Sequence, residues 1–303
     1  MKEKNKEKLL SKRVFNMAMC ELIRKTEQEK RYGTSANYRA AFLCFSRFLQ
    51  EEKKLFVLSK ELLSEYEYWL RGRGILWNSI SFYMRNLRAM CRCLSDRGVS
   101  LPTDLFGRAY TGVDKTKKRA LSEDVMSRIR YANLEAYPDL AYSRDLFLFS
   151  FYCRGMAFVD LAFLTKQNIQ GERICYMRRK TGQMLEVALE PCMKEIIQRY
   201  PGVNEYLFPL VRTSVPVEAY RQYRVAISIF NRNLKKLALL LDIPPLSSYM
   251  SRHSWATIAH NRNVPLSLIS ESMGHSSEKI TRIYLASFNQ DLIDEVNRSV
   301  ISF

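Results

Sequence analysis

Apolar residues recur at helical spacing through the first hundred residues of the chain, and polar residues fill the positions between them. One such run places Tyr38, Phe42, Phe45 and Leu49 on a single helix face. We predict four helices: one from about Leu9 to Lys30, a second capped by Thr34 or Ser35, a third capped by Ser59 that runs through Trp69, and a fourth from Asn78 to Arg97. This part of the chain is therefore predicted to be helical throughout.

The rest of the chain keeps the helical period except in one stretch. Ser122 and Pro138 each open a helix, and the second is strongly apolar through LFLFSFYC. Further helices are predicted over 191–200, 217–240, 248–261, 265–274 and 290–301. In contrast, ERICYMRRKTGQMLEVALEP favours two strands joined by a turn at Thr181 and Gly182. The predicted fold class is mainly α with a small β-hairpin or sheet.

Residues 98–119 lack any clear periodicity and combine Gly, Pro and Thr with a basic cluster, which is typical of a linker. A chain of 303 residues is long enough for two domains of ordinary size. We therefore predict a helical domain over 1–105, a linker over 106–120 and a second domain over 121–303.

The charge balance points to a polyanionic partner. Lys and Arg total 48 against 31 Asp and Glu, a formal net charge of +17. With 47% hydrophobic residues the chain is a folded protein rather than a basic tail, and nucleic acid is the favoured partner. The alternatives are a membrane surface or a merely soluble basic protein. The candidate DNA contacts are Arg85, Arg88, Arg92, Lys115, Lys117, Lys118, Arg178 and Arg179. Each of these could equally belong to a solvated surface.

Several function classes find no support in the sequence. The charged N-terminal stretch lacks a signal-peptide core, and no stretch approaches the roughly 18 apolar residues of a spanning helix, so we expect a cytoplasmic protein without membrane segments. The 7 cysteines form no CxxC pair and there are only 3 histidines, which disfavours both disulfides and zinc. No cofactor is predicted.

The candidate chemistry lies in the stretch from Ser247 to Ser287. Arg252 is the unusual residue in a helix that packs on a core, and His275 directly follows a helix that stops at Gly274. Ser276 or Ser277 can cap a further helix that carries Tyr284 about two turns in. Arginine clamps phosphate oxygens, histidine donates or shuttles a proton, and tyrosine can be a nucleophile, so a phosphate site is plausible. The alternative is a helical core with a solvated arginine and two surface groups.

Two upstream residues are ambiguous on local grounds. Arg154 ends the apolar helix, where it either caps carbonyl groups or faces a cleft. Lys180 lies at the predicted hairpin tip, where a lysine is usually just solvated.

Taken in order, Arg154, Lys180, Arg252, His275 and Tyr284 resemble the residue set of the tyrosine recombinases, also called the phage integrase family. The likeness spans nearly the whole chain, and its most specific parts are SRHSWAT at 251–257 and MGHSSEKITRIYL at 273–285. One position departs from the family pattern. Tyr249 stands where the family most often has a histidine, and a neutral phenol donates a hydrogen bond but cannot shuttle a proton as imidazole does. Tyrosine at this position resembles a Bacteroidetes-type branch of the family.

The resemblance implies a chemical role for each of these residues. The Tyr284 hydroxyl would attack a DNA phosphodiester to give a 3′-phosphotyrosine and a free 5′-hydroxyl, without ATP or a metal. Arg154 and Arg252 would hold the non-bridging oxygens, His275 would donate to the same phosphate, and Lys180 would protonate the leaving 5′ oxygen. Tyr249 completes the candidate catalytic set.

The resemblance also implies an architecture. A helical core-binding domain and a catalytic domain would close around double-stranded DNA as a clamp, with four protomers on two sites. The last helix, 290–301, would dock on a neighbouring protomer or pack on its own domain. Inversion, integration with excision, and resolution all remain open. A non-catalytic DNA-binding protein of the same fold and a type IB topoisomerase are the rival functions.

Overall fold

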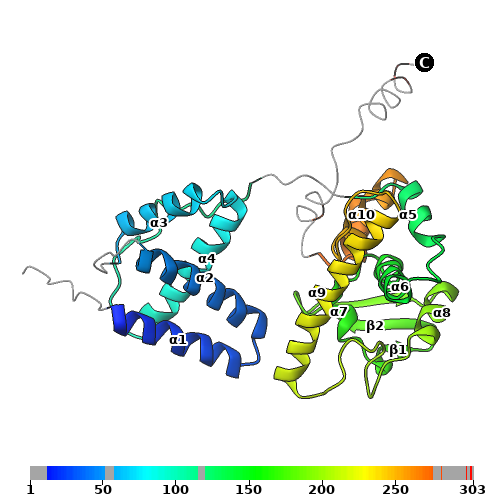
Figure 1. Ribbon diagram of the computed structural model, residues 1–303, viewed down its shortest axis with the longest axis horizontal. Coiled ribbons are helices and arrows are strands. Elements are labelled where there is room, and N and C mark those ends of the chain that lie inside the picture. Colours follow the sequence, from blue (N-terminus) through cyan, green and yellow to red (C-terminus); the bar gives the residue numbers. More distant parts are fainter. Residues whose placement is uncertain are drawn as a thin grey trace, which may run out of the picture. The chain divides into compact units, whose positions relative to one another are not determined.

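The computed structural model describes residues 12–51, 58–114 and 120–275, together with the single positions 281, 298 and 301. The chain divides into two compact units, Met1–Thr116 and Lys117–Phe303, which are shown in Figure 1. Each unit has its own hydrophobic core. None of the helices in the described ranges has the length and apolarity needed to cross a bilayer.

The first unit contains α1 (Lys12–Gln28), α2 (Tyr32–Glu51), α3 (Lys60–Gly72) and α4 (Trp77–Ser95), in agreement with the four predicted helices. Its core is rich in aromatic rings, and Phe45 packs edge-on against Tyr66 with ring centroids 5.0 Å apart. Ser59 caps α3 as predicted, because its side chain accepts from the Leu62 amide. The predicted cap of α2 is wrong. Ser35 lies inside that helix, buried, and its hydroxyl donates to the Ile23 carbonyl of α1 at 3.3 Å.

Much of the segment predicted as a linker packs on the first unit. Phe106 is buried in its core, and the Ser81 hydroxyl of α4 donates to the Gly112 carbonyl at 2.6 Å. Asn78 and Asp114 exchange two hydrogen bonds, of 3.0 and 2.8 Å. The folded part of this unit therefore extends to Asp114. These anchors are single tertiary contacts, and a periodicity argument has no means to detect them.

The second unit is built from helices around one small sheet. Its elements are α5 (Glu123–Arg130), α6 (Pro138–Tyr152), α7 (Phe158–Ala162), a 3₁₀ turn (Lys166–Asn168), β1 (Ile169–Gln170), β2 (Arg173–Met177), β3 (Met184–Ala188), α8 (Pro191–Arg199), α9 (Pro216–Leu240), α10 (Met250–Asn261) and α11 (Leu266–Ser272). The sheet is antiparallel in the order β1-β2-β3. The mainly α fold class with a small sheet is confirmed, while α7 and β1 are additions too short to show a period.

Helix α6 is the central element of this unit. Figure 1 shows α9 and α8 on opposite sides of it, and α5 and α10 also contact it. Residues 145–150 are buried in succession, so this part of the helix is enclosed on all sides. The hairpin register pairs Ile174 with Val187 and Tyr176 with Leu185, and all four side chains are buried. Because side chains alternate between the two faces of each strand, one face of the hairpin packs against the core.

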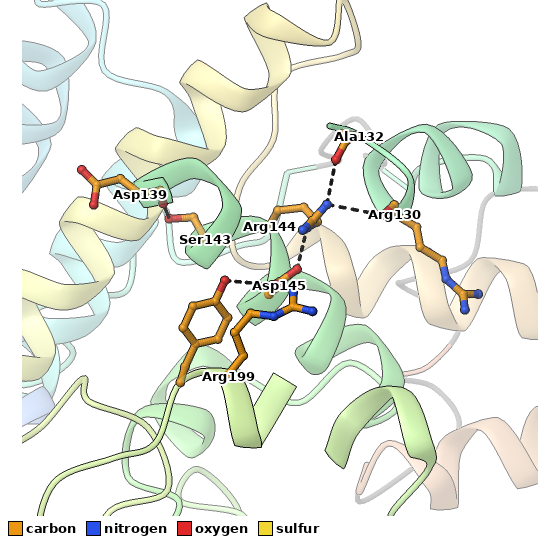
Figure 2. Close-up of polar contacts among 8 residues, drawn as sticks. Arg130, Ala132, Asp139, Ser143, Arg144, Asp145 and Arg199 are labelled. Atoms are coloured by element: carbon orange, nitrogen blue, oxygen red, sulfur yellow. Dashed lines mark hydrogen bonds and ion pairs between the residues drawn. The ribbon is translucent and has the colours of Figure 1, made fainter. Parts of the chain in front are cut away.

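A buried carboxylate ties α6 to its neighbours. Asp145 is only 3% exposed and accepts from Arg144 Nε at 2.5 Å, from Arg199 Nη1 at 2.7 Å and from the Tyr200 hydroxyl at 2.9 Å. The same Arg144 donates through Nη1 to the Ala132 carbonyl at 3.0 Å. Figure 2 shows this network, which joins α6, the end of α8 and the connection before α6. Each oxygen of the carboxylate accepts from a charged guanidinium, and these hydrogen bonds offset the free-energy cost of burying the negative charge.

Asp145→Ala should therefore destabilise the second unit by about 3–5 kcal/mol, since it leaves Arg144 buried without its counter-charge. Glu186→Ala is the control, because Glu186 pairs with Arg173 where both side chains are 54% exposed, and the loss should stay below about 1 kcal/mol. Hydrogen exchange of the α6 amides measures the opening free energy of this unit. Equal losses in the two variants would contradict a stabilising role for Asp145.

Candidate active site

The site begins where α6 ends. Arg154 and Gly155 both adopt left-handed backbone, with φ of 57° and 73°, and the amides of Gly155 and Met156 donate to the Ser150 carbonyl at 2.9 and 3.0 Å. Backbone groups thus satisfy this helix end. Within the described part of the chain, the half-buried Arg154 guanidinium makes no hydrogen bond or ion pair, so it does not cap α6. The alternative, an arginine kept for an external anion, fits these observations.

Gly155 brings α10 against this turn. A Cβ at Gly155 would lie 2.5 Å from the Cα of Arg252, which leaves no room for any other residue. Next to this contact, the hydroxyls of Ser150 and Ser251 lie 2.8 Å apart in the interior. The close approach positions Arg252 beside the Arg154 turn.

Arg252 is 2% exposed and is the largest fully buried side chain among the described residues. Its Nη1 donates to the Gly155 carbonyl at 2.9 Å, and its Nη2 donates to the Met273 carbonyl and lies 2.9 Å from His275 Nε2. The interpretation of Arg252 as a solvated surface residue is therefore wrong. The arginine and the histidine of the sequence motif meet in one buried cluster.

His275 is held by the turn that ends α11. Gly274 is left-handed at φ 63°, and the His275 amide donates to the Ser270 carbonyl at 3.0 Å. Arg178 Nη1 donates to the Gly274 carbonyl. Successive carbonyls of the turn, those of Met273 and Gly274, thus each accept from a buried guanidinium, which orients the histidine between them.

This contact corrects the prediction for Arg178. It was expected to contact DNA from an exposed hairpin, but its side chain is only 5% exposed and holds the Gly274 turn. A strand pattern cannot tell which residue of an Arg-Arg-Lys run turns inward. Arg179 and Lys180 are exposed, and Arg179 lies 4.0 Å from the centre of the Phe163 ring.

The environment of His275 disfavours the imidazolium form. Burial, followed by the positive charges of Arg252, Arg178 and Lys180, lowers the pKa of His275 to about 4. A guanidinium has only donors, so Nε2 must be the acceptor from Arg252. The ring proton then lies on Nδ1, which faces the Thr281 hydroxyl at 2.8 Å. Without DNA, His275 is neutral and its Nε2 is already engaged.

Sequence reasoning missed Asp160 of α7. This carboxylate is 5% exposed and its Oδ1 accepts from the Arg179 amide at 2.9 Å, which fixes the start of the hairpin turn. Burial raises the pKa of Asp160, and nearby Arg178, Arg179 and Arg252 oppose that rise. A lone acid in the apolar run FVDLAFL was the available signal.

The remaining predicted residues are distributed as follows. Tyr249 is 40% exposed at the start of α10, with its ring 5.2 Å from that of His253. Arg85 and Arg92 are exposed on α4, whereas Arg88 donates to the Phe106 carbonyl and the Thr111 hydroxyl, both at 3.3 Å. The remaining predictions lie outside the described residues: Tyr284, Lys115, Lys117, Lys118 and most of the segment 290–301. No cluster of three metal-ligating side chains occurs in the ranges that the structure describes.

These features define a class of site. They are Arg154, which makes no hydrogen bond or ion pair among the described residues, the buried Arg252 with its orienting His275, and the exposed Lys180 of the hairpin. Donors of this kind are suited to binding a phosphate group.

Comparison with known families identifies the chain. The Phage integrase family matches residues 119–291, more than half of the chain, and the Phage integrase SAM-like domain matches residues 14–93. The chain belongs to the phage integrase family and is a site-specific tyrosine recombinase. No curated protein sequence matches it significantly.

Solved structures of the same fold agree with this assignment. A lambda integrase dimer bound to a COC′ core site is 15% identical over 84% of this chain and 88% of that one, with a TM-score of 0.62. The Tn1549 transposon integrase in complex with circular intermediate DNA is 16% identical over 92% of this chain and 99% of that one, with a TM-score of 0.61. The XerH site-specific recombinase bound to a palindromic difH substrate is 15% identical over 86% of this chain and 78% of that one, with a TM-score of 0.61.

Gly155→Ala should reduce the rate of DNA cleavage on the order of 10²-fold, because the added Cβ displaces Arg252. Gly171→Ala is the matched control, since Gly171 also has positive φ, at 58°, but open space around its Cβ position. Both variants share the backbone strain of roughly 1–2 kcal/mol. Single-turnover cleavage separates them, and equal rates would show that the contact with Arg252 does not matter.

The His275 ring should titrate with a midpoint near pH 4, as observed by NMR and assigned through a His275→Asn variant. Because the pKa of the folded protein lies below that of the unfolded chain, the contribution of His275 to stability is complete above about pH 6.5 and is lost as the pH falls toward 4. A midpoint at 6.5 or above would contradict the cationic environment described for the ring.

Proposed function

We propose that the Tyr284 hydroxyl attacks a DNA phosphodiester to give a 3′-phosphotyrosine and a free 5′-hydroxyl, and that this hydroxyl then attacks the phosphotyrosine of a partner strand. The observation that carries this proposal is the buried Arg252–His275 pair beside Arg154, which makes no hydrogen bond or ion pair among the described residues. His275 stands nine residues before Tyr284 in the sequence. Because the bond energy is kept in the protein–DNA link, the exchange needs neither ATP nor a metal.

In this proposal the two arginines stabilise the transition state. Arg154 and Arg252 hold the non-bridging oxygens, where negative charge grows as the tyrosine attacks. Their geometry supports the assignment, since Arg252 is preorganised by carbonyls of two separate turns while Arg154 keeps its donors available. Lys180, exposed on the hairpin, protonates the departing 5′ oxygen as the general acid.

His275 and Tyr249 complete the proposed site. A bound phosphate brings a negative charge close to His275, which raises the pKa of the ring and lets it donate to a phosphate oxygen. Tyr249 lies three residues before Arg252 and is 40% exposed, and in this proposal its phenol donates to the same phosphate. We infer that the chain is from the Bacteroidetes-type branch, because that branch has tyrosine at this position.

We further propose that the helical unit is the core-binding domain and that the two units clamp double-stranded DNA. Exposed Arg85, Arg92 and Arg179 are the proposed phosphate contacts among the described residues, with Lys115, Lys117 and Lys118 beyond them. The Arg88 guanidinium already donates hydrogen bonds within the unit. We therefore expect Arg88 to contribute less to DNA binding than Arg85 and Arg92.

Assembly on DNA is proposed to involve four protomers on two sites, with segment 290–301 docking on a neighbour. Support comes from a similar structure, that of a lambda integrase tetramer bound to a Holliday junction. The reaction takes place in the cytoplasm, where the DNA is. The DNA beside the gene identifies the reaction type, since inverted repeats around a promoter indicate an invertase and element ends indicate an integrase.

Tyr284→Phe should bind a nicked suicide substrate as well as the parent chain but form no covalent adduct, because it lacks the nucleophilic oxygen. Tyr131→Phe is the matched control, since Tyr131 is 75% exposed on the same unit and should form adduct normally. Denaturing gels of labelled substrate measure the adduct.

An adduct formed by Tyr284→Phe would overturn the assignment of the nucleophile. DNA binding without any adduct from the parent chain would favour the non-catalytic alternative. Relaxation of supercoils without exchange between two sites would favour a type IB topoisomerase.

A further inference from the structure

Thr281 makes a contact that the proposed mechanism does not use. It is 0% exposed, and its hydroxyl lies 2.8 Å from Nδ1 of His275. On the other side of the ring, Nε2 lies 2.9 Å from Nη2 of Arg252. Threonine, histidine and arginine therefore form a continuous buried chain of hydrogen bonds that ends at the proposed phosphate-binding guanidinium.

The direction of these hydrogen bonds follows from donor chemistry. Arg252 offers only donors, so Nε2 of the neutral ring must accept, and the single ring proton must lie on Nδ1. That proton points at the Thr281 oxygen, which has lone pairs to accept it. The other tautomer would set an Nε2 proton against a guanidinium proton and leave Nδ1 facing a hydroxyl. Arg252 therefore selects the tautomer, and the hydroxyl of Thr281 accepts the Nδ1 proton and fixes the ring orientation in which His275 orients Arg252.

We propose that Thr281 is a positioning residue of this recombinase, which accepts the Nδ1 proton of His275, fixes the orientation of that ring and thereby the orientation of Arg252. The inference rests on the proposed function, in which Arg252 holds the scissile phosphate. Thr281 also precedes Tyr284 by three residues in the sequence. Through His275, the hydrogen bond of Thr281 links this residue to Arg252.

Packing alone would be the other reason to bury a threonine here. The two roles involve different atoms, since packing uses the methyl group and the volume, whereas the positioning role uses the hydroxyl. Thr281→Val keeps the shape and removes the hydroxyl, and Thr281→Ser keeps the hydroxyl and removes the methyl group. Thr257→Val is the matched control, because the Thr257 hydroxyl of α10 has no hydrogen-bond partner in the described part of the chain.

The tautomer is measured directly by ¹⁵N NMR of the His275 ring in the full chain without DNA, assigned through His275→Asn. The parent chain, Thr281→Ser and Thr257→Val should show the proton on Nδ1. Thr281→Val should keep the proton on Nδ1, because Arg252 still donates to Nε2, but should change the chemical shift of the Nδ1 proton and speed its exchange with solvent. Thr281→Val should also form covalent adduct about tenfold more slowly or worse, the size expected when a buried donor loses its partner, while Thr281→Ser stays within about threefold of the parent.

Two results would overturn the inference. One is an Nδ1 proton whose chemical shift and exchange rate are unchanged in Thr281→Val, and the other is an equal loss of rate in Thr281→Ser and Thr281→Val, which would assign the effect to packing. Failure of the proposed function gives a different pattern. In that case the parent chain forms no adduct on the suicide substrate, while the change in the Nδ1–H signal between the parent and Thr281→Val is still observed.

Discussion

The buried guanidinium of Arg252 is the interaction on which the second unit's site depends. Removing a cation from water is costly, and the protein offsets that cost with the carbonyls of Gly155 and Met273 and the lone pair of His275. The Met273 carbonyl lies at the C-terminal end of α11, where backbone dipoles present partial negative charge, and the Gly155 carbonyl lies in the turn that follows α6. One arginine therefore sets the mutual position of the end of α6 and the end of α11, which carry Arg154 and His275.

The charge balance around this cluster prepares the site for an anion. Positive charge from Arg252, Arg178 and Lys180 acts on His275, and Asp160 is a buried acid close to the same arginines. A neutral histidine is the consequence in the DNA-free protein. A phosphate entering such a site meets donors that are already oriented, so little reorganisation is needed when charge develops during the reaction.

Stability and chemistry are assigned to different parts of α6. Asp145 in the middle of the helix is fully partnered within the protein and gathers the surrounding elements. The turn after the last residue, Tyr152, instead leaves Arg154 unpartnered among the described residues and in left-handed backbone. A rigid helix held at its centre thus presents a strained, available group at its end, a common division between scaffold and site.

Periodicity and cap chemistry were enough to predict the helices and the hairpin, because both are local properties that need no partner. The sequence motifs also pointed to Arg252 and His275 as neighbours in one site. Which charged side chains are buried could not be predicted in the same way. Segments distant in sequence meet in each of these contacts: Arg178 is buried against the Gly274 turn, and Asp160 contacts the hairpin. Hydrogen bonds run from Thr281 through His275 to Arg252, and residues up to Asp114 pack on the first unit. Such contacts depend on how elements meet in space, and no local pattern records that.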